Sequence, residues 1–373
     1  MRASGPMGIP EDSAPSYRAP VNGLRGIAAL TVAVYHFHYY SDFPWRETFP
    51  GINYGFMAVD FFFILSGLII SHVYLNQFKE FHAKDYLVYL FLRFSRLFPA
   101  HLFVMLSLLL AALFGVLCLE RPPLGRTEFM DWLFQASMVR QWALPEKFVW
   151  NSPAWSISAE MFAYALLFPV FARMGNRASR RNAGLLFLAI GFVSLFYLIH
   201  RFQSLNLVSN GGPLCRVTFE FMIGVGLYCL FQETTLKERP WSKVFLGGVI
   251  LLVGVVALRR HLLASNLAVL SDGLVLVAFC FMISGAYKSD QGVSKVLQSK
   301  PLFWLGEISF SLYLCHIPIF RLTDYVATSF LEISYRGVAY NAVQLAFAVA
   351  AAHLLFTQIE KPSRRFLRHQ IGY

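Results

Sequence analysis

Long apolar segments alternate with short polar connections along almost the whole chain. About ten of these segments approach the roughly 20 residues that a helix needs to cross a bilayer. They lie near residues 21–41, 55–75, 97–119, 155–173, 183–201, 213–232, 244–258, 265–287, 302–320 and 335–359. The pattern therefore predicts an all-α fold, a bundle of about ten transmembrane helices.

Composition and short connections predict a single membrane domain over residues 1–373. Hydrophobic residues make up 57% of the chain and charged residues only 14%, which excludes an ordinary soluble protein. We expect a polar tail at 1–20, a basic tail at 360–373 and no fused soluble domain. The longest connection, about 120–154, combines prolines with tryptophans, so we expect an interfacial or re-entrant helix there.

The basic residues indicate how the chain crosses the membrane. The net charge is +11, and about two thirds of the 32 Lys and Arg residues would be cytoplasmic if the N-terminus were inside. This bias predicts an even number of spans with both termini in the cytoplasm, and it suits a bacterial inner membrane. The basic clusters at 173–181 and 361–368 are expected to meet anionic lipid headgroups. Nucleic-acid binding is not expected, because no recognised nucleic-acid-binding pattern accompanies the charges.

The five cysteines stand singly in apolar segments of the sequence. Their odd number and the absence of CxxC spacing argue against a disulfide framework and against a zinc site. We therefore expect small buried packing residues and no bound metal.

Arg25 and His36 are two ionisable residues within the first expected span. Such residues are costly inside a membrane and are usually functional. Eleven residues of helix bring the two side chains within about 20° of one stripe, roughly 16 Å apart along the axis. The alternative is a snorkelling arginine and a histidine that is bonded to a neighbour.

Asp60 lies near the outer end of the second expected span and needs a partner there. His36 is one candidate, because a carboxylate beside an imidazole fixes its tautomer. The alternative is that Asp60 caps the helix or meets interfacial water. We expect Ser66 and Gly67 to allow close helix packing. No base near Ser66 is visible in the sequence that would make its hydroxyl a nucleophile.

Arg93 and Arg96 lie where the chain enters the third expected span. A spacing of three places both guanidinium groups on one helix face, where they could bind phosphate oxygens. Positive-inside anchoring explains the pair equally well.

Later spans carry further polar groups. Glu160, inside the fourth span, is expected to meet a cation or a hydroxyl. Arg216 and Glu220 have the spacing of an internal ion pair. Glu307 and His316, nine residues apart in one expected helix, would face opposite ways.

Taken in order, these motifs resemble the integral-membrane acyltransferase family 3 over nearly the whole chain. The motifs are Asn22-Gly-Leu-Arg25-Gly-Ile-Ala-Ala-Leu with His36, Val59-Asp60-Phe-Phe-Phe-Ile-Leu-Ser66-Gly67, Arg93-x-x-Arg96-Leu-x-Pro99-Ala100, Trp155-Ser-Ile-Ser-x-Glu160, Leu305-Gly-x-Ile-Ser-Phe-Ser-Leu-Tyr313-Leu-x-His316-x-Pro318 and Glu360-Lys-Pro362. The resemblance implies a membrane enzyme that transfers acyl groups to exported carbohydrates, to some lipids or to small molecules.

The resemblance also implies roles for single residues. Arg25 and His36 belong to the catalytic centre, and Arg93 and Arg96 help to receive acyl-coenzyme A, a co-substrate rather than a tightly bound cofactor. We add Asp60 to the catalytic group. The residues expected to contact the acceptor or to support the site are Trp155, Glu160, Glu307, Tyr313 and His316.

The expected mechanism joins a cytoplasmic donor to an external hydroxyl. His36 acts as general base, Asp60 or Glu160 orients it, and Arg25 contacts the donor or stabilises charge. A covalent acyl group on His36 is an open variant. The acceptor stays open among exopolysaccharide, lipopolysaccharide, other envelope glycans, lipid-linked saccharides and secreted small molecules. The identity of the acyl group also stays open, with acetyl preferred. It is equally open whether a separate periplasmic protein completes the transfer. The competing hypothesis is a transporter or flippase that uses these ionisable residues as a proton or solute path.

Overall fold

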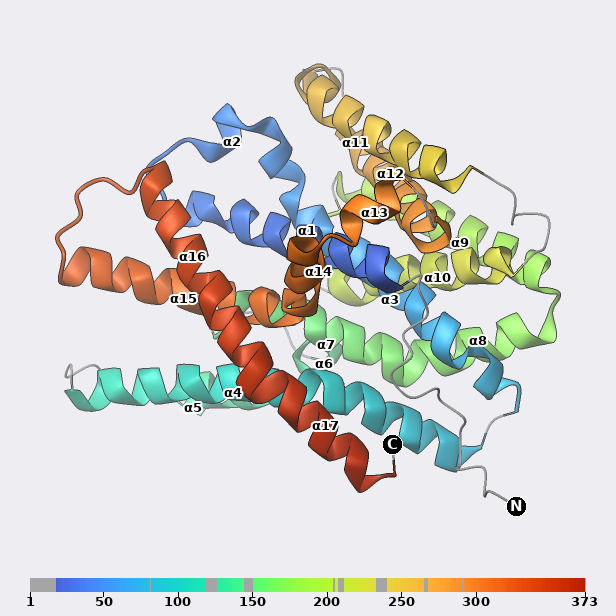
Figure 1. Ribbon diagram of the computed structural model, residues 1–373, viewed down its shortest axis with the longest axis horizontal. Coiled ribbons are helices and arrows are strands. Elements are labelled where there is room, and N and C mark those ends of the chain that lie inside the picture. The colour runs from blue at the N-terminus through green and yellow to red at the C-terminus, as the bar shows by residue number, and fades with distance from the viewer. Residues whose placement is uncertain are drawn as a thin grey trace.

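The computed structural model is a bundle of helices (Figure 1). It describes residues 18–80, 82–118, 126–143, 150–203, 205–206, 211–232, 240–264, 268–289 and 292–372. Within these residues every regular element is helical, so the predicted all-α fold is confirmed.

The principal helices follow the apolar segments of the sequence. They are α1 (Arg18–Tyr35), α3 (Ala58–Tyr74), α4 (Ala83–Cys118), α7 (Trp155–Phe162), α8 (Phe168–Arg177), α9 (Arg180–Phe202), α10 (Gly212–Phe231), α11 (Trp241–Ala264), α12 (Ala268–Lys288), α14 (Lys300–Glu307), α15 (Ser309–Ser329), α16 (Val338–Leu355) and α17 (Lys361–Gln370). The shorter elements are η1 (His36–Tyr39), α2 (Trp45–Thr48), η2 (Pro50–Met57), η3 (Leu75–Phe78), α5 (Arg126–Ala136), α6 (Arg140–Ala143), η4 (Ser152–Ala154), α13 (Val293–Leu297) and the π-helical turns η5 (Ala163–Leu167) and η7 (Phe356–Glu360).

Most of the expected spans are long and apolar enough to cross a membrane. Eight helices of the described residues meet this requirement, and α14 with α15 makes a ninth if the bent pair is one span. α1, which carries Asn22 and Arg25, is helical as expected but is not among them. The orientation of the termini stays a prediction.

Two differences from the expected boundaries move predicted site residues. α4 begins at Ala83 and continues through Pro99, so Arg93 and Arg96 lie well inside a helix and not at its entry. The ninth expected span is broken after Glu307, and α14 and α15 meet at an angle of 69°. The prediction that Glu307 and His316 face opposite sides of one helix is therefore wrong, because no single helix contains both.

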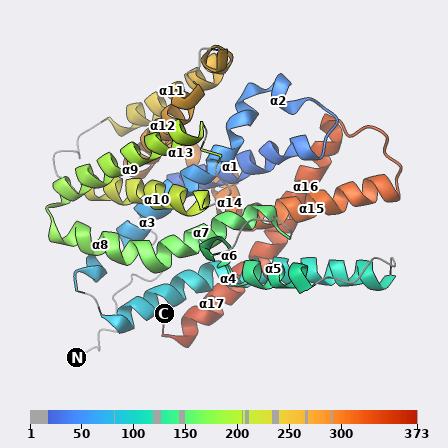
Figure 2. The ribbon, with the colours of Figure 1, turned by 180° about the vertical axis from the view of Figure 1, so that it is seen from behind.

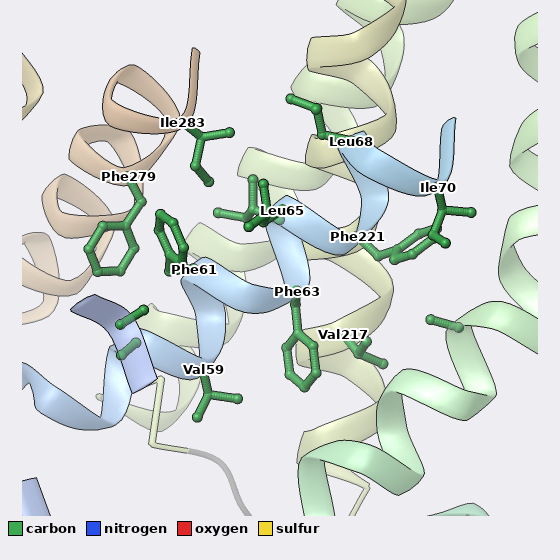
Figure 3. Packing of buried hydrophobic residues seen from close by; sticks show 14 of the residues in the cluster. Val59, Phe61, Phe63, Leu65, Leu68, Ile70, Val217, Phe221, Phe279 and Ile283 are labelled. Atoms are coloured by element: carbon green, nitrogen blue, oxygen red, sulfur yellow. The ribbon is translucent and has the colours of Figure 1, made fainter. Parts of the chain in front are cut away.

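The centre of the bundle is formed where α3 packs against α10 and α12. The rings of Phe61 on α3 and Phe279 on α12 meet edge to face at 5.6 Å (Figure 3). α3 and α10 cross at Gly67 and Gly224, where an added Cβ at Gly67 would lie 2.1 Å from the carbonyl oxygen of Phe221. The predicted role of Gly67 in close helix packing is confirmed.

The other helices surround this centre. α9 and α10 run side by side on the face shown in Figure 2. α1 packs against α3, α14 and α15, while α16 and α17 cross α15 and α4 (Figure 1). The helix expected near 120–154 is present as α5, whose Trp132 indole donates a hydrogen bond to the Met105 carbonyl on α4 at 2.8 Å. Residues 119–125 and 144–149 of that connection lie outside the described residues.

Candidate active site

His36 stands where α1 ends and η1 begins. Its Nδ1 lies 2.8 Å from the carbonyl oxygen of Val32 and 3.2 Å from Nε2 of His316 on α15. The two imidazole rings have centroids 5.0 Å apart, and the ring of Tyr39 stacks on His36 at 6.0 Å. His36 is half-buried and His316 is fully buried. Two elements far apart in the sequence therefore meet as a pair of histidines, which we call the histidine pair.

Asp60 pairs with Arg216 and not with His36. Nη2 of Arg216 donates to both carboxylate oxygens of Asp60 at 2.8 Å, and both side chains are buried. A buried carboxylate is best compensated by a bidentate guanidinium, which the crossing of α3 and α10 places beside it. The expected orientation of His36 by Asp60 is thus wrong in this geometry. The catalytic role assigned to Asp60 has no observation in its favour here.

Arg216 has two further neighbours. The Glu220 carboxylate lies 3.8 Å away, so the predicted ion pair within α10 is confirmed as a longer contact beside the Asp60 pair. The guanidinium carbon also lies 5.2 Å from the centre of the Trp155 ring. Trp155, expected in the site, therefore covers a buried ion pair.

A second polar cluster surrounds Arg25, which we call the arginine centre. Arg25 interacts electrostatically with Arg96, Glu160 and Glu360. Its Nη1 donates to Oδ1 of Asn22 at 3.3 Å. Two cations and two carboxylates thus interact around Arg25.

Glu160 contributes to the arginine centre from α7. Its Oε1 accepts hydrogen bonds from the hydroxyls of Ser66, at 2.6 Å, and of Tyr164. The prediction that Glu160 meets a cation or a hydroxyl is confirmed. Tyr164 lies in the π-helical turn η5, and such turns are frequent at functional sites.

Glu360 is a member of the arginine centre that the sequence did not single out. It ends the π-helical turn η7, is buried, and accepts a hydrogen bond from the Ser311 hydroxyl at 2.7 Å. It also interacts electrostatically with Arg25 and Arg96. The terminal Glu360-Lys-Pro362 motif was the available signal, but its position after the last apolar segment gave no reason to place it beside Arg25.

Arg93 and Arg96 have different surroundings despite their shared spacing. Arg93 is buried, donates to the Tyr74 hydroxyl at 2.7 Å and lies 4.9 Å over the Tyr74 ring. Arg96 is half-buried and forms no hydrogen bond with any residue that the structure describes. Of the two, Arg96 is the more exposed, and its whole guanidinium is left for a phosphate.

The remaining predicted residues fall into two groups. The Tyr313 hydroxyl lies 2.6 Å from Oγ of Ser156 and 2.9 Å from the Pro153 carbonyl oxygen, so it joins α15 to the start of α7. Glu307 is exposed at the end of α14 and joins neither the arginine centre nor the histidine pair. The structure therefore brings His316 to the site and leaves Glu307 outside it.

One helix connects the two centres. α1 carries Arg25 at the arginine centre and leads directly to His36 at the histidine pair, roughly 16 Å away at 1.5 Å per residue. α15 repeats this arrangement with Ser311 and His316. A polytopic membrane protein with an internal cation cluster and a separate imidazole has the groups needed to bind an anion and to move a proton.

Comparison with known proteins identifies the family. A family model described as an acyltransferase domain matches residues 19–357, so the chain belongs to acyltransferase family 3 and is an integral-membrane acyltransferase. The predicted resemblance is confirmed, and the acyltransferase hypothesis is favoured over a transporter or flippase. No solved structure matches the chain.

Three relatives illustrate the range of the family. The chain is 26% identical to the peptidoglycan O-acetyltransferase OatA of Listeria monocytogenes over 96% of this chain and 58% of the relative. It is 24% identical to the O-acetyltransferase OatA of Staphylococcus aureus over 94% of this chain and 58% of the relative. It is 25% identical to the acyltransferase MdmB of Streptomyces mycarofaciens over 93% of this chain and 92% of the relative. The chain thus spans less than two thirds of the OatA proteins but nearly all of MdmB.

Proposed function

We propose that this protein transfers an acetyl group from acetyl-coenzyme A in the cytoplasm to a hydroxyl of a carbohydrate at the outer side of a bacterial plasma membrane. The observation that carries the proposal is the placement of Arg25 and His36 at two polar centres on one helix. An anionic donor suits the arginine centre, and a hydroxyl acceptor suits the histidine pair. The names of the OatA relatives support an O-acetyl product.

The arginine centre is proposed to bind the donor phosphates. Arg96 has unused N–H donors, and among the described residues Arg25 donates a hydrogen bond only to Asn22. Guanidinium groups bind phosphate oxygens through paired N–H donors. Glu160 and Glu360 keep the two arginines compensated before the donor arrives.

The histidine pair is proposed to supply the base. His36 removes the proton of the acceptor hydroxyl, and the oxygen attacks the thioester carbonyl carbon. The new C–O bond forms, the C–S bond breaks, and the coenzyme A thiolate leaves and is protonated. Arg25, on the same stripe of α1, stabilises negative charge on the donor.

A carbohydrate is the proposed acceptor because two of the relatives described are OatA proteins, one of them named for peptidoglycan. The membrane domain either acetylates the acceptor itself or passes the acetyl group to a separate periplasmic protein. The match to MdmB over nearly its whole length favours transfer by the membrane domain itself.

Deletion of the gene tests this function. Envelope glycans and secreted small molecules of the deletion strain should lose a base-labile ester with the mass of one acetyl group, as seen by mass spectrometry. The wild-type gene should restore the ester and H36A, with its expression confirmed by immunoblot, should not. Wild-type amounts of the ester in the H36A strain would contradict the proposal.

A further inference from the structure

We infer that His316 is a positioning residue that holds His36 in the tautomer whose Nε2 is the free base, an inference that rests on the proposed function. The geometry that carries it is the contact between His36 and His316 together with the backbone carbonyls that surround both rings. The sequence assigned such an orienting role to Asp60 or Glu160. Asp60 is bound by Arg216 and Glu160 belongs to the arginine centre, so another group must orient His36.

The carbonyl contacts decide where the ring protons lie. A carbonyl oxygen can only accept a hydrogen bond, so a ring nitrogen within bonding distance of one must carry a proton. Nδ1 of His316 lies 2.9 Å from the carbonyl oxygen of Tyr313 and 3.2 Å from that of Leu312, and it therefore carries the proton. In the neutral ring, Nε2 of His316 is then a lone-pair acceptor.

The same reasoning fixes the tautomer of His36. Its Nδ1 lies 2.8 Å from the Val32 carbonyl oxygen and 3.2 Å from the His316 acceptor, so Nδ1–H donates to both. The lone pair of His36 is consequently on Nε2. No described residue forms a hydrogen bond with Nε2 of His36, and this atom is not completely buried. The nitrogen that the mechanism needs as base is the one that the protein leaves available.

His316 adds an orienting contact that Val32 alone does not supply. Val32 is in the same helix turn as His36 and moves with it, whereas His316 belongs to α15 and is fully buried. A flip of the His36 ring would remove Nδ1 from both acceptors at once. The contact from α15 therefore makes the productive orientation more stable than any other, as the hydrogen-bond partner of a catalytic histidine does in other enzymes.

Two amide variants separate orientation from folding. In H316N the shorter side chain can still bond the Tyr313 carbonyl but ends before His36. In H316Q the longer side chain places an acceptor oxygen near the position of Nε2. C315A is the matched control, because Cys315 is the neighbouring buried residue of α15 and bonds the Ala348 carbonyl on α16, away from His36.

Each variant is assayed in membranes of the deletion strain with [14C]acetyl-coenzyme A as the probe and the strain's own glycans as acceptor. H316N should lower the turnover per immunoblotted protein about 10- to 100-fold without raising the KM for the donor. H316Q should recover most of that loss, and C315A should stay near wild type. In 15N spectra of histidine-labelled protein, the His36 signals, assigned by their loss in H36A, should report protonated Nδ1 in the wild type and in H316Q and mixed tautomers in H316N.

Two results would overturn the inference: turnover and tautomer in H316N that match the wild type, or a loss in C315A as large as that in H316N. Its failure is distinct from failure of the proposed function. If H36A keeps wild-type turnover, the base itself is refuted and the positioning role falls with it. If H36A is inactive while H316N is normal, only the role of His316 is refuted.

Discussion

The buried contact between Asp60 and Arg216 predicts an unequal loss of stability when either partner is removed. Both side chains are almost completely inaccessible, and the guanidinium bonds both carboxylate oxygens at 2.8 Å. Glu220 lies 3.8 Å from the same guanidinium. R216M would leave two carboxylates buried without a cation, whereas D60N would leave Arg216 with Glu220 beside it.

The magnitudes follow from this difference. Removal of one partner of a buried ion pair costs about 3–5 kcal/mol when the remaining charge is uncompensated, which we expect for R216M. D60N keeps a cation and a carboxylate together and loses mainly charge-assisted hydrogen bonds, which are worth about 1.5–3 kcal/mol. The free energy of unfolding should therefore fall further in R216M than in D60N.

The assay is unfolding of the purified protein in mixed micelles by titration with sodium dodecyl sulfate, followed by circular dichroism. R336M serves as control, because it breaks the more exposed contacts with Asp42 and Asp324, and it should change stability far less. A loss in D60N equal to or greater than that in R216M would refute the reasoning. So would an R216M protein as stable as the wild type.

Three further predictions concern other parts of the molecule. G67A would place a methyl group 2.1 Å from the Phe221 carbonyl oxygen and should lower the free energy of unfolding by about 1–3 kcal/mol in the same titration. G254A on α11 should be tolerated, because no atom lies within 4 Å of the added Cβ. The guanidinium and backbone N–H of Arg336 hold the pKa of the Asp42 carboxyl below its ordinary 3.8. The contact between Asp42 and Arg336 should therefore contribute fully to stability above pH 3.8, and this contribution should be lost as the pH falls through the lowered pKa. Limited proteolysis of the wild type at pH 3 to 7 should show this pH dependence, and D42N should remove it. R96M should raise the KM for acetyl-coenzyme A, and R93M, which loses the Tyr74 contact, should mainly lower stability; an unchanged KM in R96M would argue against the arginine centre as the donor site.

The helices themselves were predictable because their length and hydrophobicity are local properties of the sequence. Most of the expected spans coincide with one helix of the described residues, and Gly67 was correctly expected at a close crossing. The break between α14 and α15 was not predictable, since it reflects packing of distant segments. Gly306 lies so close to α1 that an added Cβ would meet the Asn22 carbonyl oxygen at 2.0 Å.

The partners of the polar residues were harder to predict than their importance. Glu160 was expected to meet a cation or a hydroxyl, and the i,i+4 contact of Arg216 with Glu220 follows from helix geometry. The pairing of Asp60 with Arg216 joins residues 156 positions apart. Periodicity gives the face on which a residue lies but not which helix crosses that face, so Asp60 was assigned to the wrong partner.

The most direct test of the central claim is transfer of an acetyl group across a membrane by the purified protein. Proteoliposomes would receive [14C]acetyl-coenzyme A on one side only and envelope glycan from the host on the other. The wild-type protein should place base-labile 14C on the glycan across the bilayer, and H36A and R25M should not. Equal labelling by H36A, or labelling only when donor and glycan share one side, would contradict a route that runs along α1 from Arg25 to His36.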